Sequence, residues 1–503
     1  MKNEQTAATT PALLSTGAQG LDDVLAGGLA ASRLYLLEGV PGAGKTTVAL
    51  QFLREGARQG EPVLYLTLSE TIEELHAVAA SHGWTLDGVQ IRELLPPVTS
   101  LDPDEQHTLF HPSELELSET TLKILEDVER VEPLRVVFDS LSELRLLAGN
   151  SLRYRRQILA LKQFFAGRQC TVLLLDDMTA VEHDLQVQSI AHGVIRLEQH
   201  NVDYGITRRR LIVTKYRGRA YRDGYHDYRI RRGGLQVFPR LIASEHTPPL
   251  APTQITSDSA ALDALLGGGL ESGTSTLIVG APGTGKSTLA AHFAAAVSKR
   301  GAHAAMFIFD EAVATLRTRC KGMGIDLGPA IDAGHLTVRQ VDPAELSPGE
   351  LVHAIRERVM EHQAKLVVID SLNGYLNAMP DERFLVIQLH ELLTFLGQQG
   401  VITILVGAHS GLIGTHMQAP VDASYLADSV VLLRYYELYG EVRQAISVVK
   451  KRAGGHERTI RRLQFSAQGI DIGEPLRDYR GVLSGTPEPV KPQPPQEELA
   501  GEA

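Results

Sequence analysis

The chain has 503 residues, more than one hydrophobic core usually organises, so two or more domains are expected. Its composition is that of a globular protein, with 43% hydrophobic and 22% charged residues, and no apolar run approaches the roughly 20 residues that would span a bilayer. The formal net charge of -11 argues against a protein whose main task is to coat nucleic acid, because such affinity comes from neutralising phosphates.

The N-terminal residues indicate no export. The stretch MKNEQTAATTPALL lacks the basic and long apolar regions of a secretory signal, so we expect a cytoplasmic protein with a flexible N-terminus over residues 1–13. The two cysteines, Cys170 and Cys320, are too far apart in sequence to form a CxxC metal motif. We therefore expect two buried thiols and no disulfide framework.

Short apolar runs along the chain predict buried β-strands that alternate with helical stretches. In chain order they are LYLLEG (34–39), VLYLTL (63–68), LRVVFD (134–139), TVLLLD (171–176), LIVG (277–280), MFIF (306–309), LVVID (366–370) and ITILVG (402–407). Unbroken apolar runs, in contrast to alternating ones, suit parallel strands that helices cover on both faces. The predicted fold class is therefore α/β with mostly parallel central sheets.

The same order of motifs occurs twice in the chain. LDDVLAGGL begins at Leu21 and LDALLGGGL at Leu262, and Lys45 returns as Lys286, both at an offset of 241 residues. The runs LRVVFDS and KLVVIDS, and later TKYRG and VKKRA, repeat at offsets of 231 and 235 residues. Preserved order and spacing over such a length indicate a duplicated domain.

Proline-rich segments separate and follow the two copies. The segment ASEHTPPLAPT, residues 243–253, has three prolines, which cannot donate to a sheet, and is expected to be a linker. Residues 484–503 are too rich in Pro and Glu to build a core and are expected to be disordered. The expected domains therefore span residues 14–242 and 254–483.

Each copy contains a glycine-rich loop of the pattern GxxxxGK[ST] between an apolar strand and a helix. Glycines let backbone N–H groups curl around phosphate oxygens, and the helix N-terminus adds a favourable field. The residues expected to bind ATP are Gly39, Gly42, Gly44, Lys45, Thr46 and Thr47 in the first copy and Gly280, Gly283, Gly285, Lys286, Ser287 and Thr288 in the second.

A magnesium ion is expected beside each loop. In this motif the lysine reaches the β- and γ-phosphates, while the hydroxyl of Thr46 or Ser287 holds Mg²⁺. A carboxylate at the end of a buried strand completes the outer coordination of the metal, and Asp139 and Asp370 each end an apolar strand and precede Ser-Leu. ATP and Mg²⁺ are therefore the expected substrate and cofactor.

Hydrolysis also needs a group that orients the attacking water. The candidates directly follow the second strand of each copy: Ser69 and Glu70 in LTLSET, and Asp310 and Glu311 in FIFDEA. A serine hydroxyl cannot serve as this base at neutral pH, so the three carboxylates are the chemically suited groups.

These motifs together resemble those of the KaiC-like branch of the RecA superfamily of ATPases. The resemblance rests on the LDxxL…GGL motif, the P-loop, the acidic pair, the buried Asp-Ser-Leu and the late KxR strand, and it covers roughly residues 14–488. It implies two tandem RecA-like P-loop NTPase domains. It also implies a ring of identical chains, expected to be a hexamer, with ATP at the subunit boundaries.

In this family two adjacent glutamates follow the second strand, and the first of them activates water. Here the first position holds Ser69 in the first copy and Asp310 in the second, while Glu70 and Glu311 match the second glutamate. Aspartate is one methylene shorter, and a misplacement of about 1 Å can lower a rate about 100-fold. We therefore expect slow turnover by the first copy through Glu70 and some turnover by the second through Asp310.

The resemblance also implies a role for the late basic strand of each copy. In KaiC-like rings a lysine and an arginine reach the nucleotide of the neighbouring subunit, and the matching residues are Lys215, Arg217, Lys450 and Arg452. Strand alternation places residues i and i+2 on one face, and a fixed cation near the γ-phosphate stabilises charge in phosphoryl transfer. The alternative is that these are solvated charges on a strand edge.

Autophosphorylation is a further activity that the resemblance implies. KaiC-like second domains phosphorylate an adjacent Ser and Thr, and the matching positions before DSVVLL are Ser424 and Tyr425. Only the serine is retained, so the hypothesis is a serine/threonine autokinase acting on Ser424. The alternative is an ordinary interface loop, and regulatory protein partners are left open.

The sequence leaves two other functions open. Residues 205–240 hold eleven Arg or Lys against two Asp, interleaved with Tyr216, Tyr221, Tyr225 and Tyr228. Basic residues among aromatics are typical of nucleic-acid surfaces, so a DNA-dependent ATPase of RecA type is the runner-up, although the acidic chain argues against it. The weakened base positions favour a third reading, an ATP-gated assembly scaffold with little hydrolysis.

Overall fold

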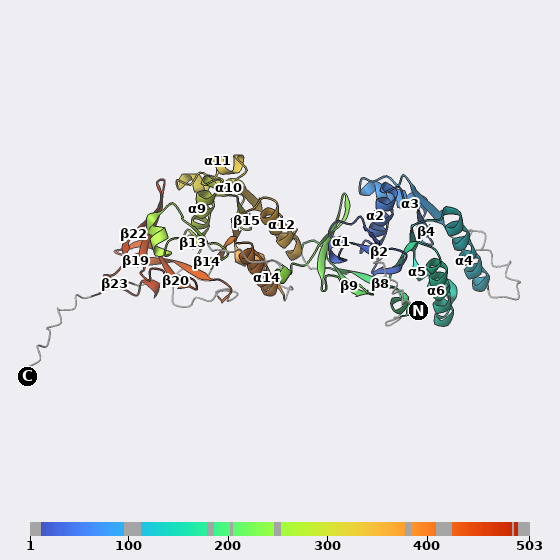
Figure 1. Cartoon of the computed structure of the whole chain (residues 1–503). Coiled ribbons are helices and arrows are strands. Elements are labelled where there is room, and N and C mark those ends of the chain that lie inside the picture. The colour runs from blue at the N-terminus through green and yellow to red at the C-terminus, as the bar shows by residue number, and fades with distance from the viewer. Residues whose placement is uncertain are drawn as a thin grey trace, which may run out of the picture. The chain divides into compact units, whose positions relative to one another are not determined.

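The structure, a computed structural model, describes residues 12–94, 112–178, 186–201, 205–245, 253–377, 384–408, 425–484 and 487–490. The chain divides into two units, one ending at Arg240 and the other beginning at Leu241, which we call the first and second domains (Figure 1). Each domain has its own nine-stranded sheet, so each is described by itself.

The sheet of the first domain has the spatial order β5-β4-β6-β7-β3-β8-β9-β10-β11. Strands β5 to β8 are parallel along this order, and β8 to β11 pair antiparallel. The bounds are β3 Leu34–Gly39, β4 Val63–Thr67, β5 Val89–Glu93, β6 Arg135–Asp139, β7 Thr171–Asp176, β8 Gly193–His200, β9 Arg208–Tyr216, β10 His226–Arg231 and β11 Gly234–Phe238. Two short strands, β1 (Leu13–Leu14) and β2 (Leu29–Ala30), pair separately.

Helices cover both faces of the first sheet because its central strands are apolar on both sides (Figure 1). Along β3, Tyr35 and Leu37 pack with helices α2 and α3, whereas Leu34 and Leu36 pack with α4, α5 and α6. The helix bounds are α1 Leu21–Val24, α2 Lys45–Arg58, α3 Ile72–Ser81, α4 Pro112–Val131, α5 Leu141–Ala148, α6 Ser151–Ala166 and α7 Gln186–Ile190.

The second domain repeats this plan with the order β16-β15-β17-β18-β14-β19-β20-β21-β22, parallel up to β19 and antiparallel beyond it. The bounds are β14 Ser275–Gly280, β15 Ala304–Ile308, β16 Leu336–Gln340, β17 Leu366–Asp370, β18 Ile402–Ala408, β19 Ser429–Leu438, β20 Glu441–Lys451, β21 Arg461–Ser466 and β22 Gly469–Pro475. The short pairs are β12 (Gln254–Ile255) with β13 (Leu270–Glu271), and β23 (Tyr479–Arg480) with β24 (Glu488–Pro489).

Helices also cover both faces of the second sheet. Leu289 of α9 and Leu316 of α10 lie in one core, and Ile355 of α12, Tyr375 of α13 and Leu389 of α14 lie in the other. The bounds are α8 Ala260–Leu265, α9 Lys286–Lys299, α10 Val313–Gly322, α11 Gly328–Asp332, α12 Pro348–Met360, α13 Leu372–Asn377 and α14 Leu385–Gln398. In the described part of the chain, no helix combines the length and the apolar character needed to cross a membrane.

The predicted fold class is confirmed. All eight apolar runs of the sequence form strands of the two parallel regions, and the two domains place their strands in the same spatial order. Each predicted run lost at most a residue or two at its ends. Cys170 and Cys320 are both buried and free, and burial raises the pKa of each thiol to about 11.

The proline-rich segments are only partly described. Residues 246–252 of the expected linker and residues 485–486 and 491–503 of the expected tail lie outside the described residues. Within the expected tail, β24 pairs with β23 in the register Tyr479 to Pro489 and Arg480 to Glu488. The richness of this segment in Pro and Glu predicts disorder, whereas Glu488 and Pro489 form the short strand β24.

One buried histidine of the first domain has a protonation state that its neighbours fix. His226 on β10 is fully buried, its Nδ1 accepts the Arg240 N–H at 2.9 Å, and its Nε2 donates to the Arg222 carbonyl at 2.9 Å. Burial lowers its pKa to about 4; the hydrogen bond to the Arg222 carbonyl opposes this shift, the charges of Arg222 and Arg240 add to it, and Asp223 has a smaller opposing effect. The ring is therefore neutral, and a second proton has no acceptor at Nδ1.

The first domain should lose stability through His226 as the pH falls from about 6.5 to about 4. A pKa below its unfolded value means that the unfolded chain binds the proton first, which costs on the order of 3 kcal/mol of unfolding free energy once pH is below both values. Urea unfolding followed by Trp84, the only tryptophan in the chain, measures this domain. His226→Gln should flatten the pH dependence, whereas His76→Gln, at an exposed site, should keep it. Equal slopes in the two variants would contradict the assignment.

Candidate functional site

Each P-loop joins a central parallel strand to a helix, as the sequence predicts. In the first domain β3 ends at Gly39 and α2 begins at Lys45, and in the second β14 ends at Gly280 and α9 begins at Lys286. The first turn of each helix therefore points its unpaired N–H groups into the loop, where an anion binds favourably.

The glycine before each lysine is required by both backbone conformation and space. Gly44 and Gly285 have φ angles of 99° and 95°, in the left-handed region that favours glycine. A Cβ atom at Gly44 would lie 2.5 Å from Ile230 Cδ1, and one at Gly285 would lie 2.1 Å from the Phe465 ring. Each P-loop thus packs directly on an antiparallel strand, β10 or β21.

Both P-loop lysines are buried, with relative exposures of 6% and 8%. Lys45 Nζ donates to the carbonyls of Gly39 at 2.7 Å and Val40 at 3.2 Å. Lys286 Nζ donates to the carbonyl of Ala281 at 2.8 Å. The loop itself therefore holds each ammonium at the position where phosphate oxygens enter.

The two buried aspartates lie beside the P-loop hydroxyls. Asp139 ends β6 and Asp370 ends β17, and burial raises the pKa of each carboxyl to about 6. Asp370 is hydrogen-bonded to the Ser287 hydroxyl, while Asp139 Oδ2 accepts the Tyr65 hydroxyl at 2.6 Å. The peptide bond that follows each aspartate is cis. The structure therefore brings the predicted serine and aspartate of the second domain together.

These donors fit a magnesium ion that arrives with a phosphate. Mg²⁺ usually keeps several waters and takes one or two carboxylates plus substrate phosphates. In the described ranges no group of three or more His, Cys, Asp or Glu side chains suits a permanently bound metal. In the first site one carboxylate oxygen, Glu70 Oε2, is buried without a hydrogen-bond partner among the described residues.

Glu70 reaches the first P-loop, and Ser69 does not. The Glu70 carboxyl is hydrogen-bonded to the Thr46 hydroxyl, and burial, reinforced by the Asp139 carboxylate, raises its pKa to about 7. Thr67 fixes the turn, because its Oγ1 donates to the Glu70 carbonyl at 2.8 Å and accepts the Glu70 N–H at 2.9 Å. Ser69 is exposed. Of the two candidates in the first domain, Ser69 and Glu70, the structure therefore brings only Glu70 to the site.

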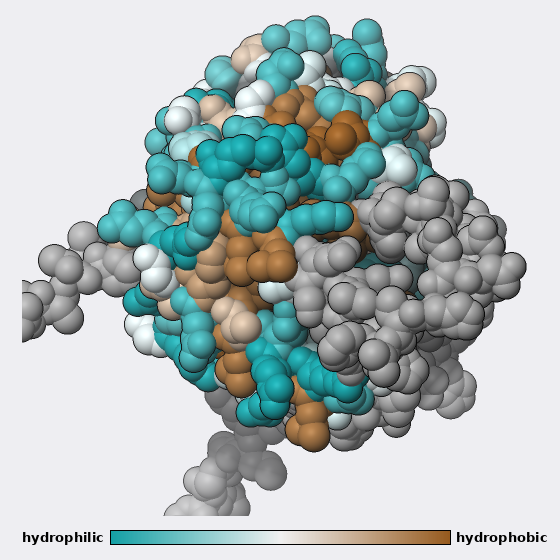
Figure 2. All heavy atoms as spheres, turned by 90° about the vertical axis from the view of Figure 1, so that its right-hand side faces the viewer, coloured by the Kyte–Doolittle hydropathy of each residue, from teal (hydrophilic) through white to brown (hydrophobic). Residues whose placement is uncertain are grey.

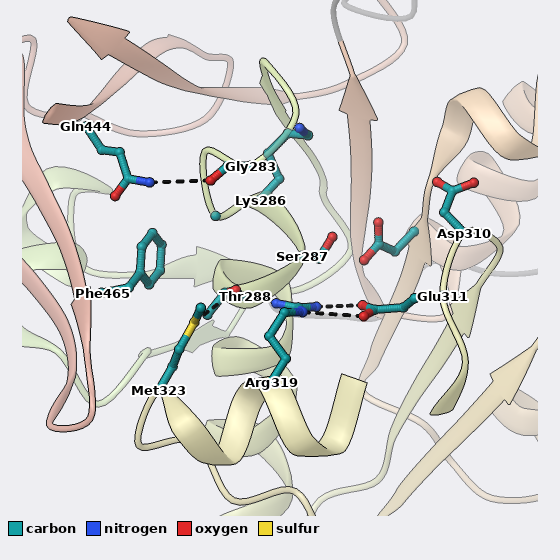
Figure 3. Close-up of a pocket in the computed structure, with 12 residues that line it drawn as sticks. Gly283, Lys286, Ser287, Thr288, Asp310, Glu311, Arg319, Met323, Gln444 and Phe465 are labelled. Carbon is teal, nitrogen blue, oxygen red and sulfur yellow. Dashed lines mark hydrogen bonds and ion pairs between the residues drawn. The ribbon is translucent and has the colours of Figure 1, made fainter. Parts of the chain in front are cut away.

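A cavity of about 470 Å³ opens beside the second P-loop (Figure 3). It is lined by Gly283, Gly285, Lys286, Ser287, Thr288, Asp310, Glu311, Arg319, Met323, Asp370, Gln444 and Phe465. Eight of these twelve residues are predicted from the sequence. The carboxylates from the ends of β15 and β17 and the hydroxyls of α9 thus converge on one space.

The two acidic residues after β15 have different partners. Glu311 is held by Arg319 from α10, whose Nη2 lies 2.5 Å from Glu311 Oε1 (Figure 3). Arg319 Nη1 also donates to Thr288 Oγ1 at 2.5 Å. Asp310 makes no ion pair in the described part of the chain and accepts the Ser371 hydroxyl at 2.5 Å. Asp310 is therefore the acidic side chain that is oriented without being neutralised.

Sequence reasoning missed four residues that shape the sites. Asp177 forms an ion pair with Lys45 at 2.7 Å, and Arg319 binds Glu311. Tyr65 and Ser371 position Asp139 and Asp310. The pair DD that ends TVLLLDD was a usable signal for Asp177, because it follows a buried strand as the recognised aspartates do. The arginine on α10 gave no such signal.

The late cations lie away from the P-loop of their own domain. On β9, Lys215 Nζ donates to the Gln188 carbonyl at 2.6 Å, and Arg217 donates to the Ser189 carbonyl at 2.7 Å. Lys215 pairs with Val194 near the start of β8, whereas the P-loop end of β3 pairs with Leu197. Burial lowers the pKa of Lys215, and the charge of Arg217 adds to the effect.

The same holds in the second domain. Lys450 Nζ donates to the Ala427 carbonyl at 2.7 Å, and Arg452 Nη2 donates to the Tyr425 carbonyl at 2.7 Å. Neither side chain lines the second-domain cavity. The structure therefore does not bring these cations to their own nucleotide site, which is the arrangement that action on a neighbouring subunit requires.

The candidate phosphosite is only half described. Ser424 lies outside the described residues. Tyr425 is exposed, and its carbonyl accepts the hydrogen bond of Arg452. The hypothesis of phosphorylation at these positions stays a prediction.

The basic and aromatic segment 205–240 is mostly structural. Tyr216 and Tyr228 are buried, and their hydroxyls donate to the carbonyls of Gly28 at 2.9 Å and Ala43 at 2.7 Å. Of its tyrosines, only Tyr225 is exposed, and it hydrogen-bonds to Glu198. Buried rings cannot stack on bases, so the segment lacks the row of aromatic platforms expected of a nucleic-acid surface.

Comparisons with known proteins bear on the whole chain. The protein-family model described as "ATPase: KaiC" matches residues 14–242 and again residues 255–477. Among curated relatives, the circadian clock oscillator protein KaiC of Acaryochloris marina is 27% identical over 94% of this chain and 90% of the relative. The circadian clock protein KaiC3 of Synechocystis sp. is 28% identical over 94% of each. The circadian clock oscillator protein KaiC of Synechococcus elongatus is 26% identical over 95% of this chain and 92% of the relative.

The two family matches coincide with the two sheets and their P-loops, and the relatives are covered nearly from end to end. The resemblance stated from the motifs is therefore confirmed. The chain belongs to the KaiC family of ATPases, with two tandem domains of that family.

Proposed function

We propose that this protein binds and hydrolyses ATP with Mg²⁺ at both P-loops and assembles with copies of itself into a ring, a hexamer by family resemblance. The observation that carries the proposal is the cavity of the second domain, where a P-loop lysine, three carboxylates and a serine hydroxyl converge. Phosphoryl transfer needs this combination of cation, metal donors and water-orienting carboxylate.

In the second domain, Lys286 and the first N–H groups of α9 bind the phosphates of the ATP substrate. Ser287 and Asp370 hold the metal, and Mg²⁺ when bound neutralises charge that develops on the phosphates. Asp310 accepts a proton from the attacking water, and Ser371 orients Asp310 through the hydrogen bond of 2.5 Å. Glu311 is bound by Arg319, so its role is to position Arg319. Asp310 is therefore the residue that accepts the proton of the water.

In the first domain, Glu70 is the carboxylate that faces the P-loop. Its carboxyl is hydrogen-bonded to the hydroxyl of Thr46, the residue expected to bind Mg²⁺, and Ser69 offers no second carboxylate, which supports slow turnover.

Two observations support assembly of identical chains. The cations Lys215, Arg217, Lys450 and Arg452 are held at a distance from their own P-loops. Apolar side chains also lie on the surface of the first domain, where Figure 2 shows hydrophobic patches between polar ones. The exposed leucines of helices α4, α5 and α6 are Leu122, Leu146, Leu152 and Leu159. Exposed apolar groups of this kind favour burial against another protein surface.

Nucleotide stoichiometry and size test the proposal. The full chain should bind two ATP molecules, Lys45→Ala or Lys286→Ala should each bind one, and the double variant none. Sizing with and without Mg²⁺ and ATP should show a ring only with nucleotide. A chain that binds two ATP molecules after both lysines are replaced would contradict the assignment of both sites.

An autokinase activity of the second domain is a second candidate. It is favoured by the hydrogen bond of Arg452 to the Tyr425 carbonyl, which links the segment of the candidate phosphosite to a residue expected to contact a neighbour's nucleotide. Incubation with labelled ATP and peptide mass spectrometry tests it. Absence of phosphate at both Ser424 and Tyr425 rejects it. The other alternative, a DNA-dependent ATPase, would instead be favoured if single-stranded DNA stimulated ATP turnover at low salt.

A further inference from the structure

The P-loop lysine of the first domain has an acidic partner that its counterpart lacks. Asp177 Oδ1 lies 2.7 Å from Lys45 Nζ, and the side chains are 29% and 7% exposed. Asp177 directly follows β7, the strand between β3 with its P-loop and β6 with Asp139. The carboxylate therefore stands at the edge of the sheet where phosphates of a nucleotide enter.

The position of Asp177 is fixed by two serines, Ser142 on α5 and Ser140 just before α5. Its backbone N–H donates to Ser142 Oγ at 3.3 Å, and Ser140 Oγ lies 3.4 Å from its Oδ2. Its adjacent residue, Asp176, is engaged elsewhere, since Arg145 donates to it at 3.0 Å. The Lys45 contact is therefore specific to one of two consecutive aspartates.

The second domain has alanine at the matching position. In the first sheet Glu38 on β3 pairs with Asp176, and in the second sheet Val279 and Gly280 on β14 pair with Gly407 and Ala408. Because Glu38 and Val279 share the offset of 241 residues, Ala408 corresponds to Asp177. In the described part of the second domain, Lys286 makes no ion pair and donates to a carbonyl.

A carboxylate bonded to this ammonium competes with a triphosphate. The P-loop lysine binds β- and γ-phosphate oxygens, so the γ-phosphate must share or replace the contact that Asp177 now makes. Beyond the effect of burial, Asp139 and Glu70 are close enough to Asp177 for its charge to raise the pKa of each, so the three carboxyl groups lie in one acidic neighbourhood. A diphosphate brings only its β-phosphate to Lys45, so it competes with Asp177 for this ammonium less than a triphosphate does.

We propose that Asp177 is a specificity-determining residue that makes the first domain discriminate against nucleoside triphosphates and in favour of diphosphates. The proposal rests on the proposed nucleotide binding at the first P-loop. The second domain, with Ala408 at the matching position, does not discriminate in this way. The two sites of one chain would then differ in nucleotide content at the same ATP to ADP ratio.

Trp84 gives a signal from the first domain alone. It is the only tryptophan of the chain, and its ring contacts the His82 ring at a tilt of 37° with centroids 4.6 Å apart. His82 Nε2 lies 3.3 Å from the Thr47 hydroxyl of the P-loop helix. Its fluorescence in the full-length protein should therefore respond to nucleotide at this P-loop. Titration with ATP or ADP, each with Mg²⁺, yields a dissociation constant for each nucleotide.

Asp177→Ala should tighten ATP binding roughly three- to tenfold and change ADP binding less, since a partly exposed ion pair is worth about 1 kcal/mol. Asp177→Asn, which keeps the shape, should act in the same direction. Glu73→Ala removes one negative charge from the exposed face of α3 and should leave both constants unchanged. The reciprocal change, Ala408→Asp in a Lys45→Ala chain, should weaken binding of labelled ATP to the second domain by a similar factor.

The outcomes separate the two ideas. An unchanged ratio of ATP to ADP dissociation constants in both Asp177 variants overturns the discrimination, while nucleotide binding at the site stands. A Trp84 response that survives Lys45→Ala overturns nucleotide binding at the first P-loop itself. Urea unfolding followed by Trp84 shows in each case that the variant is folded.

Discussion

Replacing Asp310 with asparagine should lower ATP turnover by the second domain about 100- to 1000-fold, within the range expected for loss of a general base. Asp310 lines the cavity of the second P-loop and accepts the Ser371 hydroxyl, so its free oxygen has a fixed direction. Asparagine keeps this shape and cannot take a proton. The measurement is single-turnover hydrolysis in a chain that also carries Lys45→Ala, so that only the second site contributes.

Glu311→Gln is the matched control for this experiment. Glu311 lies next to Asp310 in sequence but is bound by Arg319, so its replacement should lower turnover less than about tenfold, as expected when a group does not take part in proton transfer. Binding of ATP should be nearly unchanged in Asp310→Asn. If Glu311→Gln proves the more damaging variant, the water-orienting role belongs to the second acidic residue.

Replacing Arg135 with alanine should destabilise the first domain by about 3–5 kcal/mol, the usual cost of breaking a buried charged pair. Arg135 on β6 is fully buried, and its guanidinium bonds to Glu61 and donates to the carbonyls of Ser15 at 2.7 Å and Phe52 at 2.9 Å. Truncation leaves a carboxylate and two carbonyls without this donor, together with a cavity. Urea unfolding followed by Trp84 measures the loss.

Two comparisons sharpen this prediction. Arg168→Ala removes a partly exposed arginine paired with the exposed Glu129 and should cost less than about 1 kcal/mol, as surface pairs do. Arg135→Leu should cost less than Arg135→Ala because it fills the space, and the matching position of the second sheet already holds Leu366. Equal losses in Arg135→Ala and Arg168→Ala would show that the buried network contributes little.

The parts that the sequence predicts well depend on local signals. Apolar runs such as LYLLEG form strands because their residues can be covered on both faces, and the P-loop spacing fixes Lys45 and Lys286 at the start of a helix. Asp139 and Asp370 were found because a charge directly after a buried strand must lie at the sheet edge. None of these inferences requires knowledge of which strands are neighbours.

The parts that the sequence does not predict depend on the order of strands in space. Asp177 contacts Lys45 because β7 lies beside β3, although more than a hundred residues separate them in sequence. Arg319 contacts Glu311 from the helix α10, eight residues further along the chain. A residue pattern does not predict that this helix directs its arginine back to the acidic residue. In the sequence, the tyrosines of residues 205–240 suggest a nucleic-acid surface. In the structure, Tyr216 and Tyr228 face the interior of the domain and are buried.

The packing of each P-loop on an antiparallel strand has a consequence for communication between subunits. Gly44 is in contact with Ile230 of β10, Gly285 is in contact with Phe465 of β21, and no atom can be added between them without a collision. A movement of either loop toward a phosphate would therefore press on these strands. Because the neighbouring strands β9 and β20 bear Lys215 and Lys450, we expect such a movement to reach these cations and, in the proposed ring, the next subunit boundary.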